Sequence, residues 1–209
     1  NLTPFTIPGH KQRASQIDQG LGAVVDADIP LYGGLDEIKL TNQILVKAEK
    51  LAANLWGADY ARFSTGGSTH ANQAVILALG KPGDKVAISR TAHRSVLSAL
   101  VIAGLEPIWM SPEIDLATGV PIGIALPELE KALAGNPIAV LLTEPGYLGT
   151  LSDLKPLIDA AHKKSIPVIV DAAWGGHFGF HPDLPAHVIA QGADALVTSV
   201  HKALPGYSA

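Results

Sequence analysis

A lysine near the end of the sequence stands where covalent chemistry is possible. The apolar, β-branched run 195–200 predicts a buried strand. This run contains Ser199 near its end, and His201 and Lys202 follow it. A lysine at the mouth of a buried strand can lose its proton through desolvation and attack a carbonyl carbon, forming a Schiff base. The same lysine could instead extend its ammonium group into solvent. The segment by itself leaves both interpretations open.

An acidic residue ends another apolar run. Asp171 closes the predicted strand 167–170. A buried carboxylate is costly without a positively charged partner, and a protonated pyridine nitrogen would serve as one. His93, after an earlier predicted strand, could stack on an aromatic ring. The alternatives are a carboxylate that caps the following turn and an ordinary loop histidine, which is the commoner case for a lone histidine.

A glycine-rich segment could bind phosphate. Gly66, Gly67, Ser68 and Thr69 join a predicted strand to a predicted helix. Glycines let the backbone approach an anion, and amides at a helix N-terminus with two hydroxyl groups beside them suit a phosphate. The segment matches neither a Walker loop nor the GxGxxG fingerprint. Its alternative is ordinary capping of the helix by Ser68 or Thr69.

These residues together suit one cofactor. A phosphate site, a ring-stacking histidine, an acid for a pyridinium nitrogen and a Schiff-base lysine are what pyridoxal phosphate requires. The chain has no cysteine, so it has neither disulfides nor thiolate metal ligands, and no metal site is predicted.

The elements that must position these residues alternate along the chain. Apolar spacing predicts strands at 60–64, 85–89, 106–110, 138–143, 167–170 and 195–200. It predicts helices at 36–55, 68–79, 95–103, 126–134, 154–163 and 186–191. Uniformly apolar strands separated by helices indicate a three-layer α/β fold, with a mostly parallel sheet and helices on both faces.

The carboxyl ends of such strands form one ligand-binding edge. The segments expected there are 64–69, 90–93, 144–147, 171–174 and 199–202. Residues 1–36 are rich in glycine and aspartate without a sustained period, so they are predicted to be an irregular N-terminal arm. The large domain is predicted over 37–209.

Composition limits the partners. The chain has 209 residues, of which 47% are hydrophobic and 16% charged, enough for one large domain. Its net charge of −4 gives no reason to expect nucleic acid. No apolar run approaches the roughly 18–20 residues that span a bilayer, and no signal peptide is visible. A cytoplasmic protein without a membrane partner is therefore predicted.

Four segments together resemble a known family. They are 4–12 (PFTIPGHKQ), 67–72 (GSTHAN), 170–181 (VDAAWGGHFGFH) and 199–202 (SVHK). The chain resembles the fold type I pyridoxal-phosphate enzymes and, within them, the Orn/Lys/Arg decarboxylase family. The resemblance spans almost the whole chain, and the combination of segments is specific although each alone is not.

The resemblance implies roles for individual residues. Lys202 would carry the cofactor as a Schiff base, and Asp171 would hold the pyridinium nitrogen. His93 would stack on one face of the ring, and Ala173 would lie under the other. The phosphate contacts would come from Gly67, Ser68, Thr69, Ser199 and His201. Trp174 stands where relatives have tryptophan or histidine.

The sequence departs from the family pattern in places. Gly66 replaces the family's usual asparagine, and Glu144–Tyr147 differ from the usual proline-threonine-tyrosine turn. A contact from this turn to the cofactor hydroxyl is therefore not carried over. The family's enzymes continue after the lysine with a strand between the first and last strands found here and with a smaller C-terminal domain. Without that strand the sheet is expected to have unpaired edges.

The implied activity is decarboxylation of arginine, lysine or ornithine to the amine and carbon dioxide. A homodimer or higher homo-oligomer with a shared active site is implied as well. Candidate carboxylates for a basic side chain are Asp26, Asp28, Asp36 and Glu37. One alternative is another fold type I reaction such as transamination, which usually needs an arginine from the C-terminal part. The other is a non-catalytic, incomplete domain that binds the cofactor weakly or not at all.

Overall fold

The structure is a computed structural model that describes residues 22–28 and 43–205. The segment 4–12, most of the predicted arm, Asp36 and Glu37 lie outside these residues. Contacts divide the chain into two units, Asn1–Leu55 with Asp59–Ala61, and Trp56–Ala58 with Arg62–Ala209. The division at residue 36 therefore stays a prediction.

The first unit contains helical structure where an irregular arm was predicted. Helix α1 spans Gly22–Ala27, so the prediction is wrong for these residues. Helix α2 spans Ile44–Trp56 and confirms the second part of the helix predicted from residue 36. None of the helices in the described part of the chain is long and apolar enough to cross a membrane.

The second unit is built on a parallel sheet of five strands. Its strands are β1 (Lys85–Ser89), β2 (Glu106–Met110), β3 (Ala139–Thr143), β4 (Val168–Asp171) and β5 (Ala195–Val197). They lie in the order β2-β1-β3-β4-β5, and every neighbouring pair is parallel. The predicted α/β fold is confirmed. From β1 the chain continues to β2 on one side of β1, whereas from β3 it continues to β4 on the opposite side. A topological switch point therefore lies between β1 and β3.

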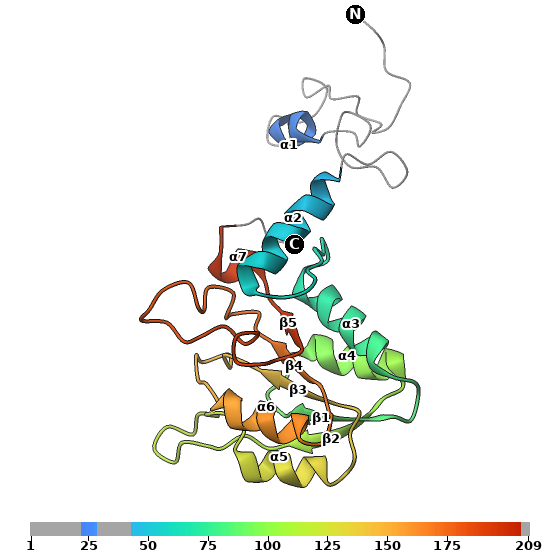
Figure 1. Cartoon of the computed structure of the whole chain (residues 1–209), viewed down its shortest axis with the longest axis vertical. Coiled ribbons are helices and arrows are strands. Elements are labelled where there is room, and N and C mark those ends of the chain that lie inside the picture. The colour runs from blue at the N-terminus through green and yellow to red at the C-terminus, as the bar shows by residue number, and fades with distance from the viewer. Residues whose placement is uncertain (1–21, 29–42, 206–209) are drawn as a thin grey trace, which may run out of the picture. The chain divides into compact units, whose positions relative to one another are not determined.

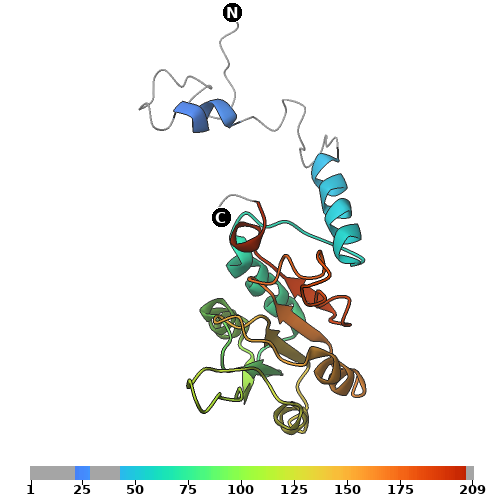
Figure 2. The ribbon, with the colours of Figure 1, turned by 90° about the vertical axis from the view of Figure 1, so that its left-hand side faces the viewer.

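Helices cover both faces of this sheet (Figures 1 and 2). Helices α3 (Gly67–Leu79) and α4 (Arg94–Ala103) cover one face, and α5 (Leu126–Leu133) and α6 (Leu154–His162) cover the other. Alternate strand residues point to opposite faces. Ile88 and Leu141 thus pack with the core under α3 and α4, whereas Val140 and Leu142 pack with the core under α5 and α6. Each fully buried side chain of this size contributes about 1.5–3 kcal/mol.

Two predicted elements are wrong. Residues 60–64 form no strand, because no strand of the described residues pairs with them to complete a hydrogen-bonded ladder. Residues 186–191 form turns rather than a helix. There the side chain of His187 accepts from the amide of Ala190, and the side chain of Gln191 donates to the carbonyl of Ala186. Side chains thus take backbone partners that a longer helix would use.

The last predicted strand is shorter than expected. Strand β5 ends at Val197, and a short helix α7 (Val200–Ala203) follows. Ser199 occupies the N-cap position of this helix. Lys202 therefore lies on a helical turn beyond the strand and not directly at its mouth.

Candidate active site at the carboxyl edge of the sheet

Asp171 is the buried acid of this edge. It is the last residue of β4, and it is 2% exposed. Asn72 Nδ2 donates to its Oδ2 at 2.8 Å, and the amide of Ala173 donates to its Oδ1 at 3.1 Å. Burial raises the pKa of Asp171, while these hydrogen bonds and the charges of His93 and Lys202 oppose the rise. The second bond is the turn-capping contact, so Asp171 caps the turn and also presents a buried carboxylate.

Asn72 connects this acid to His93. Its Nδ2 also donates to Ser95 Oγ at 3.1 Å, and Ser95 Oγ lies 2.8 Å from His93 Nδ1. His93 caps helix α4, and its Nδ1 accepts from the amide of Ser95 at 3.2 Å. Because Nδ1 accepts this bond, the single ring proton of a neutral His93 lies on Nε2. The exposed His93 ring is therefore held in orientation by the network that holds Asp171.

Sequence reasoning missed Asn72 and Ser95 as parts of the site. In the sequence, Asn72 is only the last residue of the segment 67–72 that resembles the family. A signal existed, because Asn72 lies three and four residues after Thr69 and Ser68, and residues at this spacing share a helix face. Its partner Asp171 is 99 residues away in the chain, a pairing that no local pattern reveals.

Asn72 yields a prediction about stability. Asn72→Ala removes the donor to buried Asp171 and is expected to lower the free energy of unfolding by about 1–3 kcal/mol. Urea denaturation measures this loss. Asn54→Ala, at an exposed position of α2, is the matched control and is expected to change stability by less than about 0.5 kcal/mol. Equal effects of the two substitutions would contradict the assigned role of the network.

The glycine-rich segment begins helix α3. Gly66 occupies the N-cap position without a side-chain cap, and Gly67 has φ +67°, a conformation that favours glycine. Ser68 and Thr69 lie inside the first turn, so the alternative that one of them caps the helix is wrong. A Cβ at position 66 would lie 2.8 Å from His70 Cβ, which explains a glycine there. The first-turn amides have no carbonyl partners within the helix, and phosphate binding at this helix start stays a prediction.

Lys202 lies against an aromatic side chain. Its Nζ is 4.6 Å from the ring centre of Trp174, which is itself edge-on to Tyr147 with centroids 6.4 Å apart. Ser199 is buried, and its Oγ lies 3.4 Å from His201 Nδ1. Helix α3 contacts β5, the strand that leads to these residues. Ala173, the remaining predicted site residue, is buried at the second position after β4.

Solved structures show the class of fold. A SepCysS–SepCysE N-terminal domain complex matches with a TM-score of 0.70 at 23% identity, over 94% of this chain and 52% of that one. Constitutive lysine decarboxylase of E. coli matches with a TM-score of 0.71 at 22% identity, over 87% of this chain and 28% of that one. The fold is that of the pyridoxal-phosphate-dependent transferases.

The family follows from sequence. A model described as Orn/Lys/Arg decarboxylase, major domain, matches residues 2–209, and the chain belongs to this family. Arginine decarboxylase of Bacillus subtilis (strain 168) is 38% identical over 204 residues, which are 95% of this chain and 42% of that protein. O-phospho-L-seryl-tRNA:Cys-tRNA synthase of Methanosarcina mazei is 32% identical over 154 residues, 71% of this chain and 38% of that protein. The chain thus spans less than half the length of these relatives.

Proposed function

We propose that the protein carrying this chain uses pyridoxal phosphate to decarboxylate a basic amino acid, with arginine, lysine and ornithine as candidates. The observation that carries the proposal is buried Asp171 at the carboxyl edge, with the charges of His93 and Lys202 acting on it. Relatives named arginine decarboxylase support a basic substrate. A homodimer or higher homo-oligomer with a shared active site is part of the proposal.

The described residues fit the cofactor. Asp171 is a buried carboxylate that accepts from two neutral amides, and Asn72 beside it has a buried Oδ1 without a partner in the described residues. Lys202 would hold the cofactor covalently, and Asp171 would face its ring nitrogen. His93 and Ala173 would lie against the two faces of the ring, with Trp174 nearby. The phosphate would be held by Gly67, Ser68, Thr69, Ser199 and His201.

Pyridoxal phosphate, when bound, supplies an electron sink for the pair released as the Cα–carboxylate bond breaks. Asp171 contributes a negative charge fixed by Asn72 and the amide of Ala173, so no reorganisation is needed while the ring nitrogen stays protonated. Lys202 Nζ or His93 Nε2 would return a proton to Cα. The contact of Lys202 Nζ with the ring of Trp174 would orient the amine.

A second candidate is another reaction with the same cofactor. The relative named O-phospho-L-seryl-tRNA:Cys-tRNA synthase favours it, since that name describes no decarboxylation. The same apparatus of lysine, acid and phosphate site would serve both reactions. Release of carbon dioxide from arginine, lysine or ornithine would distinguish decarboxylation, whereas transamination would yield a new amino acid.

The first experiment locates the cofactor. Borohydride reduction in the presence of pyridoxal phosphate, followed by peptide mapping, is expected to place the pyridoxyl group on Lys202. Lys85, which is exposed at the start of β1, is the internal control and should remain unlabelled. Label on Lys85 in place of Lys202 would refute the assignment, and no label on any lysine would favour the non-catalytic alternative.

A further inference from the structure

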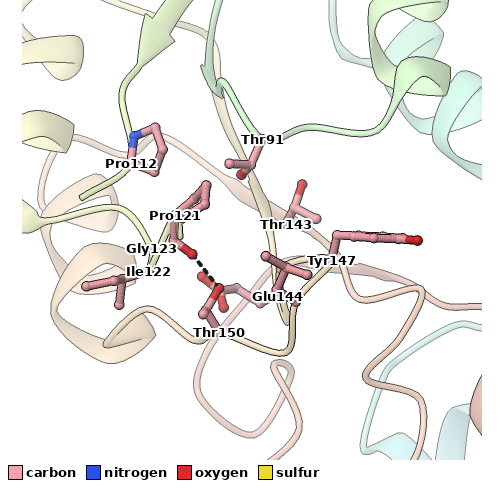
Figure 3. A pocket seen from close by; sticks show the side chains of 11 residues that line it. Thr91, Pro112, Pro121, Ile122, Gly123, Thr143, Glu144, Tyr147 and Thr150 are labelled. Carbon is pink, nitrogen blue, oxygen red and sulfur yellow. Dashed lines mark hydrogen bonds between the residues drawn. The ribbon is translucent and has the colours of Figure 1, made fainter. Parts of the chain in front are cut away.

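A pocket lies at the switch point of the sheet (Figure 3). It is lined by Thr91 after β1, by Pro112 after β2, and by Thr143 and Glu144 at the end of β3. The crevice between strands that lead to opposite sides is where sheets of this kind bind ligands. Its volume of about 230 Å³ is below the roughly 300–1,000 Å³ of sites for drug-sized ligands, so it suits one amino-acid side chain.

The two sides of this pocket differ in chemistry. Pro112, Pro121 and Ile122 form an apolar wall, and Figure 3 shows them across the pocket from Thr91 and Thr143. Thr143 Oγ1 is buried and has no hydrogen-bond partner in the described residues. A buried hydroxyl without a partner costs free energy that a ligand donor can recover. The pocket therefore offers an apolar side and an unsatisfied polar side.

Glu144 adds a buried carboxylate to the lining of the same pocket. It is 3% exposed, and both of its oxygens accept from the amide of Ser152, at 3.1 and 3.0 Å. No cationic side chain pairs with it within residues 22–28 and 43–205. Burial raises the pKa of Glu144 to about 7, against the hydrogen bonds from Ser152. A buried carboxylate with neutral donors alone is a site that a cation would stabilise.

Two contacts connect the lining of the pocket with residues proposed to hold the cofactor. The amide of Glu144, the residue after β3, donates at 3.0 Å to the carbonyl of Asp171, the last residue of neighbouring β4. Tyr147 lines the pocket and contacts Trp174, on which Lys202 rests. Contacts between side chains thus run from the lining of the pocket, through Tyr147 and Trp174, to Lys202.

We propose that this pocket binds the side chain of the basic amino-acid substrate, with its cationic end on Glu144 and Thr143 and its methylene groups along the apolar wall. The inference rests on the proposed function and assigns the residues that select a basic side chain. The acids suggested from the sequence are different ones. Of those, Asp28 is exposed in the first unit, and Asp36 and Glu37 lie outside the described residues.

Calorimetric titration of the cofactor-loaded protein tests the proposal without turnover. The probes are the decarboxylated amines of arginine and lysine, whose far ends are cationic, and that of citrulline, whose ureido end is neutral. Glu144→Gln is expected to weaken the better-bound cationic amine by on the order of 10- to 100-fold. The same substitution is expected to change the affinity for the neutral amine by less than about threefold, because a hydrogen bond to a neutral group contributes less than one to a charged group.

Two further variants keep the test decisive. Thr143→Val keeps the shape of the side chain and is expected to weaken the cationic amine by a few fold, because the buried hydroxyl is lost. Glu130→Gln, at an exposed position of α5, is the matched control and is expected to change neither probe. Folding of every variant is checked by its melting temperature.

Several results would overturn the proposal. They are no binding of either cationic amine to the wild-type protein, equal weakening of cationic and neutral amines by Glu144→Gln, or no effect of that substitution in a folded variant. Failure of the proposed function is a separate result. Carbon dioxide release with a KM for the basic substrate unchanged by Glu144→Gln rejects the pocket alone, whereas selective amine binding without carbon dioxide release rejects the decarboxylation alone.

Discussion

Asp171→Asn is expected to lower the rate of decarboxylation by about 100- to 1,000-fold, the range seen when one preorganised electrostatic stabiliser is removed. An amide cannot supply the negative charge that keeps a ring nitrogen protonated, so the electron sink weakens. The fold should tolerate the change. The amide has nearly the volume of the carboxylate, and Asn72 can rotate to offer its Oδ1, which has no partner in the described residues.

The measurement is turnover with saturating cofactor, together with the cofactor dissociation constant. Asp159→Asn, on the exposed side of α6 where Asp159 pairs with Lys155, is the matched control and should keep full activity. Near-normal turnover in Asp171→Asn would mean that Asp171 only caps the turn to Ala173. A large loss of cofactor affinity without a loss of turnover at saturation would assign it to binding instead.

Much of the sheet could be predicted because its strands are buried on both faces. Val86–Ile88 and Val140–Leu142 are apolar without alternation, a pattern that a central strand of a parallel sheet requires. The helices between them were predicted to within about two residues at each end, the usual uncertainty of helix ends. The rule that parallel strands present ligands at their carboxyl ends then indicated Asp171, His93 and Lys202.

Other features depend on contacts that sequence does not display. Residues 60–64 have the composition of a strand, but a strand also requires a neighbour that pairs with it. Residues 186–191 have apolar residues at helical spacing, but His187 and Gln191 bind the backbone there. Lys202 was expected at the mouth of a strand, and the turn from Val197 into α7 displaces it.

The acid of the pocket was hidden for a different reason. The sequence places Glu144 in a segment at the ligand-binding edge and as a departure from a family turn, but it does not show that the carboxylate is buried against Ser152. Burial makes this carboxylate a candidate for cation binding, and it also makes the ionised group expensive for the folded state. Binding and stability should therefore respond to Glu144 in opposite directions.

Glu144→Gln is expected to stabilise the protein without ligand at pH 8 and to have little effect on stability near pH 4. The pKa of Glu144 is about 7 in the folded state, against 4.5 for an ordinary glutamate side chain. Because the folded-state pKa is raised, the folded state binds the proton more tightly. The stability that Glu144 contributes is therefore fully present below pH 4.5, and it is lost as the pH rises through 7. The difference corresponds to about 3 kcal/mol.

Denaturation with urea at pH 4, 6 and 8 measures this dependence as the difference between the two proteins. The contributions of groups that titrate alike in the wild-type protein and in the variant cancel in this difference. Glutamine keeps an oxygen that can accept from the amide of Ser152, so the loop after β3 should stay in place. The stabilisation should grow by roughly 2–3 kcal/mol between pH 4 and pH 8, whereas Glu130→Gln should show no such growth. A difference that is constant with pH, or one that favours the wild-type protein at pH 8, would show that Glu144 is ionised at little cost and that its burial does not control its charge.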